Sequence, residues 1–210
     1  MHKPETIAEL RASGYLAVPV KDELRRNLID KMKKAETLFP GIVGYDDSVI
    51  PEIENAILSG HNIIFLGERG QAKTRIMRKF VDLLDEYLPI IAGCEINDNP
   101  FDPVCRQCQN VLREKGENTA ITWIHRSVRY AEKLATPDVS IADLIGDIDP
   151  VKIAEGRYLS DELAIHYGLI PRANRGILSI NELPDLHEKI QVGLFNLLEE
   201  QDVQIRGYKI

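Results

Sequence analysis

The sequence lacks an uninterrupted apolar run long enough to span a bilayer, and its first residues, MHKPETIAEL, lack the apolar segment of a secretion signal. These absences predict a cytoplasmic protein without a membrane segment. Basic charge is also scarce, because 26 lysines and arginines face 33 aspartates and glutamates, for a formal net charge of −7. The chain therefore has no broad basic field that would favour binding to nucleic acid.

Cysteine is rare as well, with three residues in 210. An odd number, with two cysteines at CxxC spacing, suits reduced thiols or a metal better than a disulfide framework. Cys94, Cys105 and Cys108 gather in a turn-rich segment, and thiolates at this spacing favour zinc. A structural zinc site needs a fourth ligand, which His125 or Asp98 supplies only if this segment folds back. Buried free thiols are the alternative interpretation.

Hydrophobic residues make up 44% of the chain, which is enough for the core of one ordinary domain with a small appendage. Apolar residues at helical spacing predict helices over 21–39, 46–60, 75–88 and 187–201. Short apolar runs bounded by turn residues predict buried strands over 62–67, 120–126 and 176–183. Residues 140–156 indicate short helices with acidic turns, and residues 202–210 begin a strand or hairpin.

The strongest motif follows the first predicted strand and opens a predicted helix. Phosphate binding needs several backbone N–H groups that converge on anionic oxygens at a helix N-terminus. Gly67 and Gly70 allow such a tight loop, Lys73 can reach the β- and γ-phosphates, and Thr74 can ligate Mg²⁺. The residues expected to contact a nucleotide here are Gly67, Glu68, Arg69, Gly70, Gln71, Ala72, Lys73, Thr74 and Arg75. A glycine-containing turn with a solvated lysine is the alternative, and the strand–loop–helix context argues against it.

One position of this loop departs from the usual pattern, in which a glycine precedes the lysine. Ala72 adds a methyl group and restricts φ, which predicts a lower affinity for the nucleotide. A loop position with right-handed backbone would tolerate the alanine.

The predicted strand over 176–183 resembles a Walker B strand, in which two polar residues follow an apolar run. The first of them helps to hold Mg²⁺, usually through water, and the second orients the attacking water as a general base. Asn181 occupies the first place, where an aspartate is expected, so Mg²⁺ binding should weaken because an amide brings no negative charge. Glu182 is the predicted catalytic base. A buried strand that ends in two polar surface residues is the alternative.

Longer stretches resemble the AAA+ module of the magnesium-chelatase ATPase subunit and MoxR group. The start of that module is similar to FPGIVGYDDSVIPEIENAILSGHNIIFLGERGQAKTR, and its Walker B region is similar to GDIDPVKIAEGRYLSDELAIHYGLIPRANRGILSINEL. The resemblance covers about residues 39–210 and implies an α/β P-loop NTPase core with a parallel sheet flanked by helices. Residues 1–38 are a helical lead-in by pattern alone.

The resemblance also implies how such a module works. It implies an ATPase that forms a ring, commonly a hexamer, and remodels a partner protein, which in the chelatase group often carries an integrin-like metal-binding domain. Tyr45 falls where related modules contact the adenine, although packing on the first helix of the module explains this residue equally well. Sensor 1, the arginine finger and the helical lid normally follow the second hairpin, so we expect the chain to end before them and to bind ATP with little turnover.

Two other interpretations stay open at this point. In the first, Ala72 and Asn181 tune the site to hold nucleotide without productive hydrolysis, so that ATP acts as a binding switch. In the second, the cysteines form a zinc-binding module and the phosphate loop is vestigial.

Overall fold

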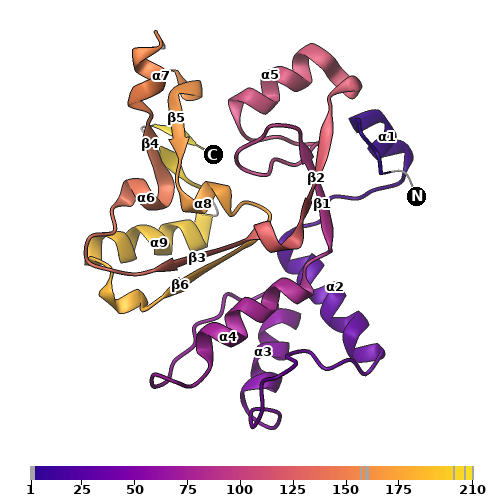
Figure 1. Ribbon diagram of the computed structural model, residues 1–210, viewed down its shortest axis with the longest axis vertical. Helices are drawn as coiled ribbons and strands as arrows, with labels where there is room; N and C mark the ends of the chain where they lie inside the picture. The colour runs from indigo at the N-terminus through magenta and orange to yellow at the C-terminus, as the bar shows by residue number, and fades with distance from the viewer. Residues whose placement is uncertain (1–2, 157, 159–160, 201, 206, 210) are drawn as a thin grey trace.

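A computed structural model describes residues 3–156, 158, 161–200, 202–205 and 207–209. The elements form three arms that meet near the centre of the molecule (Figure 1). One arm holds the helices of residues 20–79, the second a hairpin of residues 87–125 with the first helix, and the third the elements from residue 130 onward. Within the described residues, no helix has both the length and the apolar character needed to cross a membrane.

The first arm is a helical layer made of α2 (Val20–Lys33), α3 (Val49–Leu58), α4 (Lys73–Lys79) and the short 3₁₀ helix η1 (Phe80–Leu83). Their apolar faces share one core, whose buried residues are Leu28, Leu38, Phe39, Ile42, Ile53, Ile57, Ile76, Phe80 and Leu83. The helix predicted over 46–60 is therefore confirmed as α3. It positions the chain that enters the phosphate loop.

Two of the predicted helices are shorter than expected. The helix predicted over 21–39 ends at Lys33, because Ala35 adopts a left-handed backbone with φ 53° and the chain turns there. Leu38 and Phe39 are buried all the same, through the turn that follows. The helix predicted over 75–88 ends in η1, and residues from Tyr87 onward join a strand instead.

The strand predicted over 62–67 is wrong as a paired strand. Residues 61–68 have no regular secondary structure, and no strand of the described chain pairs with them. Its side chains still alternate between the core and solvent: Ile63 and Phe65 pack against the helical core. Ile64 and Leu66 are 71% and 89% exposed. Its apolar pattern is real, but a strand also needs a neighbouring strand to accept its backbone hydrogen bonds.

The second arm is an antiparallel hairpin of β1 (Tyr87–Ile91) and β2 (Ile121–His125), which confirms the strand predicted over 120–126. Between these strands the chain forms a long turn, α5 (Arg106–Lys115) and the 3₁₀ helix η2 (Gly116–Asn118). The first helix, α1 (Ile7–Ala12), packs against β2 through Ile7, Leu10 and Ile121. This hairpin arm carries all three cysteines.

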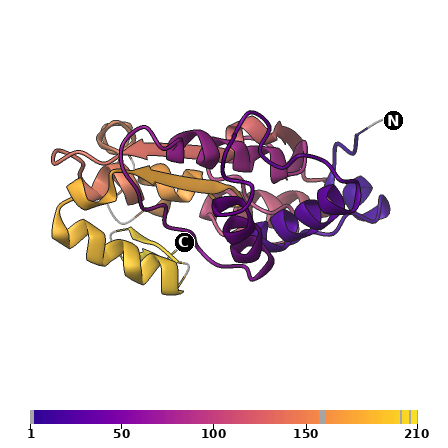
Figure 2. The ribbon, with the colours of Figure 1, turned by 90° about the horizontal axis from the view of Figure 1, so that it is seen from below.

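The third arm is built on a parallel pair, β3 (Tyr130–Leu134) and β6 (Ile177–Asn181), so the strand predicted over 176–183 is confirmed. The 3₁₀ helix η3 (Arg126–Arg129) leads from β2 into β3. The parallel sheet expected from the resemblance consists of these two strands in the described chain. The helix predicted over 187–201 is α9 (Glu188–Glu200), which runs beneath β6 (Figure 2) and buries Ile190 and Leu194. Leu198, one helical turn beyond Leu194, is 49% exposed.

Short elements complete this arm. They are α6 (Ile141–Ile145), β4 (Gly146–Ile148), α7 (Pro150–Ala154), η4 (Glu162–Ala164), β5 (Ile165–Tyr167), α8 (Leu169–Arg172), η5 (Leu183–Asp185), β7 (Gln204–Ile205) and β8 (Tyr208–Lys209). The short helices expected over 140–156 are confirmed, and their acidic residues act as caps: Asp143 closes a capping box with Ser140, and Asp149 caps α7. The hairpin expected near the end is β7–β8.

A buried ion pair ties the arms together at the centre. Both terminal nitrogens of the Arg129 guanidinium donate to the Glu23 carboxylate, at 2.7 and 2.6 Å, and both side chains are almost fully buried. The same guanidinium donates to the carbonyl of Arg175. Helix α2, the start of β3 and the turn before β6 are therefore held at one point.

Candidate nucleotide-binding site

The phosphate loop connects the extended segment 62–66 to α4. Gly70 has φ 87°, a conformation that favours glycine and lets the backbone turn tightly. The ammonium group of Lys73 donates to the carbonyls of Gly67 and Glu68, at 2.7 Å each. The lysine charge is therefore held over the backbone of the loop, next to the amides expected to contact phosphate.

Ala72 does not occupy the right-handed position that would tolerate it. Its φ of 58° and ψ of 13° are left-handed, immediately before the first residue of α4. The side chain of an L-residue costs roughly 1–2 kcal/mol in this conformation, and glycine avoids this cost. The glycine of the usual pattern is thus explained by the backbone, and the alanine of this chain carries strain at the phosphate loop.

Tyr45 and Arg75 lie beside the loop. The Tyr45 hydroxyl donates to the carbonyl of Gln71 at 3.2 Å, and its ring packs against the helical core. The guanidinium of Arg75 lies over the turn at Gly41, where a Cβ would come within 2.9 Å of Nη2. Tyr45 is thus placed at the loop and Arg75 at the turn of Gly41, while their contacts with a nucleotide stay predictions.

The two halves of the predicted site meet at Thr74 and Asn181. The Thr74 hydroxyl donates to the Asn181 amide oxygen over 3.4 Å, although the residues lie 107 positions apart in the sequence. One side chain belongs to the first turn of α4 and the other to the last residue of β6. Two oxygen atoms of the kind that Mg²⁺ prefers are thus brought together, while their binding of the ion stays a prediction.

A third group at this point, Glu132, was missed in the sequence. Its Oε1 accepts a hydrogen bond of 2.7 Å from the Asn181 amide nitrogen, and Arg78 holds the same carboxylate through two hydrogen bonds of 2.7 and 2.9 Å. The Arg78 guanidinium also holds the pKa of Glu132 below its ordinary value. Glu132 lies on β3, which pairs with β6 in parallel, so it faces the site from the neighbouring strand.

Glu182, the predicted base, follows β6 directly and is exposed. Its backbone is left-handed, with φ 54° and ψ 43°, where it caps the 3₁₀ helix η5. Non-glycine residues in this region are uncommon and are concentrated at functional sites, because the surrounding structure must hold the strain. This left-handed residue ends the strand at Asn181.

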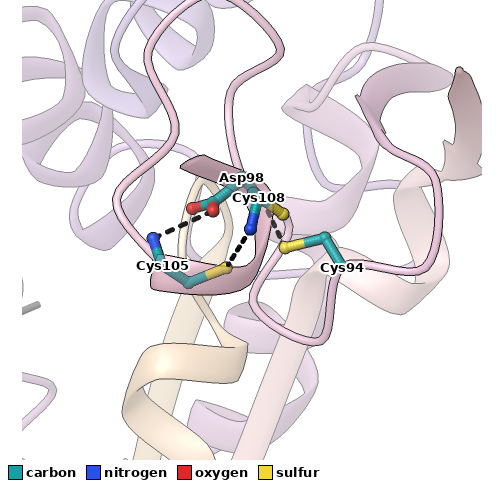
Figure 3. Close-up of side chains that lie close together, drawn as sticks. All are labelled: Cys94, Asp98, Cys105 and Cys108. Atoms are coloured by element: carbon teal, nitrogen blue, oxygen red, sulfur yellow. Dashed lines mark hydrogen bonds between the residues drawn. The ribbon is translucent and has the colours of Figure 1, made fainter. Parts of the chain in front are cut away.

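The cysteine cluster lies in the hairpin arm, apart from these residues. The segment does fold back, and Cys94, Cys105 and Cys108 lie together with Asp98 (Figure 3). His125, the other suggested partner, is not in the group, because its Nδ1 lies 2.8 Å from the Ser127 hydroxyl and its ring packs edge-on against Tyr87.

The cluster is electrostatically unusual. Hydrogen bonds from the thiols of Cys105 and Cys108 lower the pKa of the Cys94 thiol well below its ordinary value. Burial raises the pKa of the Asp98 carboxyl, and the nearby Cys94 adds to this effect. The ionised form is thus favoured at Cys94 alone among the four groups, because the pKa values of Asp98, Cys105 and Cys108 all lie above their ordinary values.

The chain is similar in sequence to several magnesium-chelatase subunits. It is 31% identical over 164 residues to the magnesium-chelatase subunit ChlI-2 of Arabidopsis thaliana, which covers 74% of this chain and 36% of the relative. Identity to ChlI-1 of the same plant is 32% over 161 residues, covering 73% and 35% of the two chains. A ChlI homolog of Methanocaldococcus jannaschii is 29% identical over 180 residues, covering 80% and 45%. The chain is a relative of magnesium-chelatase ChlI subunits.

The resemblance to the magnesium-chelatase group is therefore confirmed, and the ChlI-like chain is an AAA+ ATPase-like module. No protein-family model matches it. The chain spans between about a third and a half of the length of these ChlI relatives. In this ChlI-like chain Thr74, at the end of the phosphate loop, contacts Asn181, which Glu182 follows in the sequence, and the cysteines form a separate group with Asp98.

Proposed function

We propose that this chain binds and hydrolyses ATP as an AAA+ module, and that the whole protein couples ATP turnover to the remodelling of a partner. The contact between Thr74 and Asn181 carries this proposal, because it joins the end of the phosphate loop to the end of the Walker B-like strand. Either motif alone has a simpler explanation as a turn or a surface strand. Their meeting in space is what an ATP site requires.

The residues present fit Mg·ATP. The backbone of residues 67–72 and the Lys73 ammonium would hold the phosphates, while the Thr74 hydroxyl would ligate Mg²⁺ and Asn181 would hold it through water. Glu132 supports the cation side of the site, because its carboxylate lies against the Asn181 amide. Bound Mg²⁺ supplies positive charge that neutralises the β- and γ-phosphate oxygens.

Glu182 is the residue that we assign to the chemical step. Its carboxylate follows Asn181 in the chain and is exposed, so it is free to accept a hydrogen bond from a water molecule beside the γ-phosphate. As a general base, Glu182 would orient this water and take its proton as the water attacks the γ-phosphorus, while the bond from this phosphorus to the bridging oxygen breaks and ADP leaves with that oxygen. Tyr45 is the residue that we assign to the adenine.

A binding switch with little hydrolysis is the second candidate function. Two observations favour it: the strained backbone of Ala72 lies inside the loop that would hold the phosphates, and Asn181 has no charge where an aspartate would attract Mg²⁺. In this case ATP would gate assembly rather than drive a cycle. A zinc module with a vestigial phosphate loop is a weaker alternative, since Lys73 and Thr74 are both in place.

The proposed assembly follows from the ChlI resemblance. We propose a hexameric ring of identical subunits in which ATP binds between neighbouring subunits. The partner protein would carry an integrin-like metal-binding domain. We assign these properties to the whole protein, because the relatives are two to three times as long as the segment that matches this chain.

Calorimetry and measurements of phosphate release on the full-length protein test the proposal. Mg·ATP should bind in calorimetry, and a Glu182→Gln variant should keep this binding and lose steady-state phosphate release. Equal turnover in the two proteins would remove Glu182 as the base. Absence of Mg·ATP uptake by well-folded protein would refute the whole assignment, and uptake without release in either protein would favour the switch.

A further inference from the structure

Four potential metal ligands lie together in the hairpin arm. The sulfur atoms of Cys94, Cys105 and Cys108 and a carboxylate oxygen of Asp98 are all within 4.8 Å of one another (Figure 3). Around a single tetrahedral zinc ion with bonds of about 2.3 Å, sulfur ligands lie about 3.8 Å apart. The group therefore nearly has the dimensions of a site for one ion.

Asp98 is the most informative member of the group. Its side chain is 0% exposed, and Oδ2 accepts a hydrogen bond of 3.0 Å from the backbone amide of Cys105. Oδ1 has no hydrogen-bond partner among the described residues, although it is buried. A buried carboxylate oxygen without a partner is costly, and a cation among the three sulfur atoms would remove this cost.

The backbone also prepares two of the sulfur atoms as acceptors. The amide of Asp98 donates to Cys94 Sγ at 3.3 Å, and the amide of Cys108 donates to Cys105 Sγ at 3.4 Å. Hydrogen bonds of this kind orient ligands and spread the negative charge of a metal–thiolate centre. They come from two separate segments, the turn after β1 and the start of α5.

We propose that Cys94, Asp98, Cys105 and Cys108 form a structural Zn²⁺ site. Three thiolates suit zinc among the common divalent ions, and a complete set of four protein ligands is typical of a structural site rather than a catalytic one. Cys105 and Cys108 are 3% and 1% exposed, which protects the centre from solvent. The ion would join the turn after β1 to the N-terminus of α5.

Other uses of these thiols explain the geometry less well. A disulfide would consume two cysteines and leave the third thiol and Asp98 Oδ1 without partners. An iron–sulfur cubane binds each protein ligand through a different iron, which places the ligand atoms farther apart than around one ion. The compact group therefore favours a mononuclear centre.

The zinc site would also support the segment that leads into β6, the strand that ends in the proposed nucleotide site. The loop that contains Asp98 holds the turn before β6, because Asn97 donates to the carbonyl of Arg172 at 3.0 Å and Arg175 donates to the carbonyl of Asp98 at 3.3 Å. Strand β6 then ends at Asn181. Zinc would thus fix the loop against which the start of the Walker B-like strand is held.

Metal analysis and cobalt substitution test this proposal without any nucleotide. Protein purified with a non-thiol reductant and without chelator should carry about one zinc per chain. Replacement by Co²⁺ should give the sulfur-to-cobalt charge-transfer band and visible bands of a tetrahedral thiolate site. Zinc well below stoichiometry, or iron with inorganic sulfide, would overturn the proposal.

Variants assign the fourth ligand. Asp98→Ala should lose zinc, whereas Asp102→Ala, which removes an exposed acid from the same turn, should keep it. Because loss of a ligand can unfold the arm, Asp98→Cys provides a second measurement: it should retain one metal per chain and strengthen the charge-transfer band of the Co²⁺ form through a fourth thiolate. An unchanged band in Asp98→Cys, or zinc retained in folded Asp98→Ala, would exclude Asp98 as a ligand.

Discussion

The guanidinium of Arg78 holds both carboxylate oxygens of Glu132, and one of these oxygens also accepts the hydrogen bond from Asn181. The asparagine amide is thereby oriented, with its nitrogen toward Glu132 and its oxygen toward the Thr74 hydroxyl. A negative charge is therefore present beside the proposed Mg²⁺ position, displaced from the strand end to the neighbouring strand. This arrangement leads to a first prediction about metal affinity.

We expect Asn181→Asp to tighten Mg²⁺ binding in the presence of ATP and to raise turnover, because it adds a carboxylate at the strand end. The gain should be on the order of tenfold, which corresponds to about 1.4 kcal/mol of added attraction. Glu132→Gln should act in the opposite direction. Asp185→Asn, which removes a nearby exposed acid, serves as the control and should change neither value. Titration of Mg²⁺ at fixed ATP measures the effect, and unchanged affinity in both site variants would show that neither carboxyl position acts on the metal.

Removal of the Lys73 charge should abolish most nucleotide binding. Lys73→Met is expected to weaken Mg·ATP binding by about 10- to 100-fold, the value of one or two charge-assisted hydrogen bonds to phosphate. Lys79→Met removes a lysine from the end of the same helix, where it pairs with Asp82, and should leave binding within twofold, as calorimetry would show. Equal binding by the two variants would contradict the phosphate role of the loop.

Ala72 and Ala35 provide a matched pair of strained alanines, with φ 58° and 53°. Either change to glycine should raise the free energy of unfolding by up to about 1 kcal/mol, since relief of left-handed strain exceeds the entropic cost of glycine. Only Ala72→Gly should also tighten ATP binding, because Ala35 lies at the end of α2, outside the phosphate loop. Denaturant unfolding and calorimetry on both variants separate the two effects. If Ala72→Gly stabilises the protein without a gain in affinity, the strain is unrelated to the nucleotide.

The buried pair of Glu23 and Arg129 predicts a large loss of stability. Glu23→Gln leaves the Arg129 guanidinium charged in the interior and should cost about 3–5 kcal/mol. The exposed pair of Arg11 and Glu117 offers a comparison, because Glu117→Gln should cost at most about 1 kcal/mol. Urea denaturation measures both changes, and similar small losses would mean that the central pair contributes little.

The sequence predicted those features that depend on local pattern. Helix α3, strands β2 and β6 and helix α9 follow from the spacing of their apolar residues, whereas the apolar run over 62–67 that precedes the phosphate loop predicted a strand that does not form. The place of Glu132 in the site could not be predicted in this way. Strand β3, YAEKL, mixes polar and apolar residues without a clear pattern, and its position beside β6 depends on tertiary pairing. The left-handed backbone of Ala72 is likewise set by the loop as a whole. The sequence left Asp98 and His125 as alternatives for the fourth ligand, and the fold of the hairpin arm decides for Asp98, which it brings to the cysteines.

The central ion pair has a consequence for the design of shorter proteins. Shortening that begins at residue 39, where the resemblance to the chelatase module starts, would delete the acid that neutralises Arg129. The guanidinium would then have to draw in water or shift the turn before β6, next to the strand that ends at Asn181. The segment before residue 39 thus supplies the counterion of Arg129, and activity measured on such a trimmed protein would report a damaged interior instead of the native site.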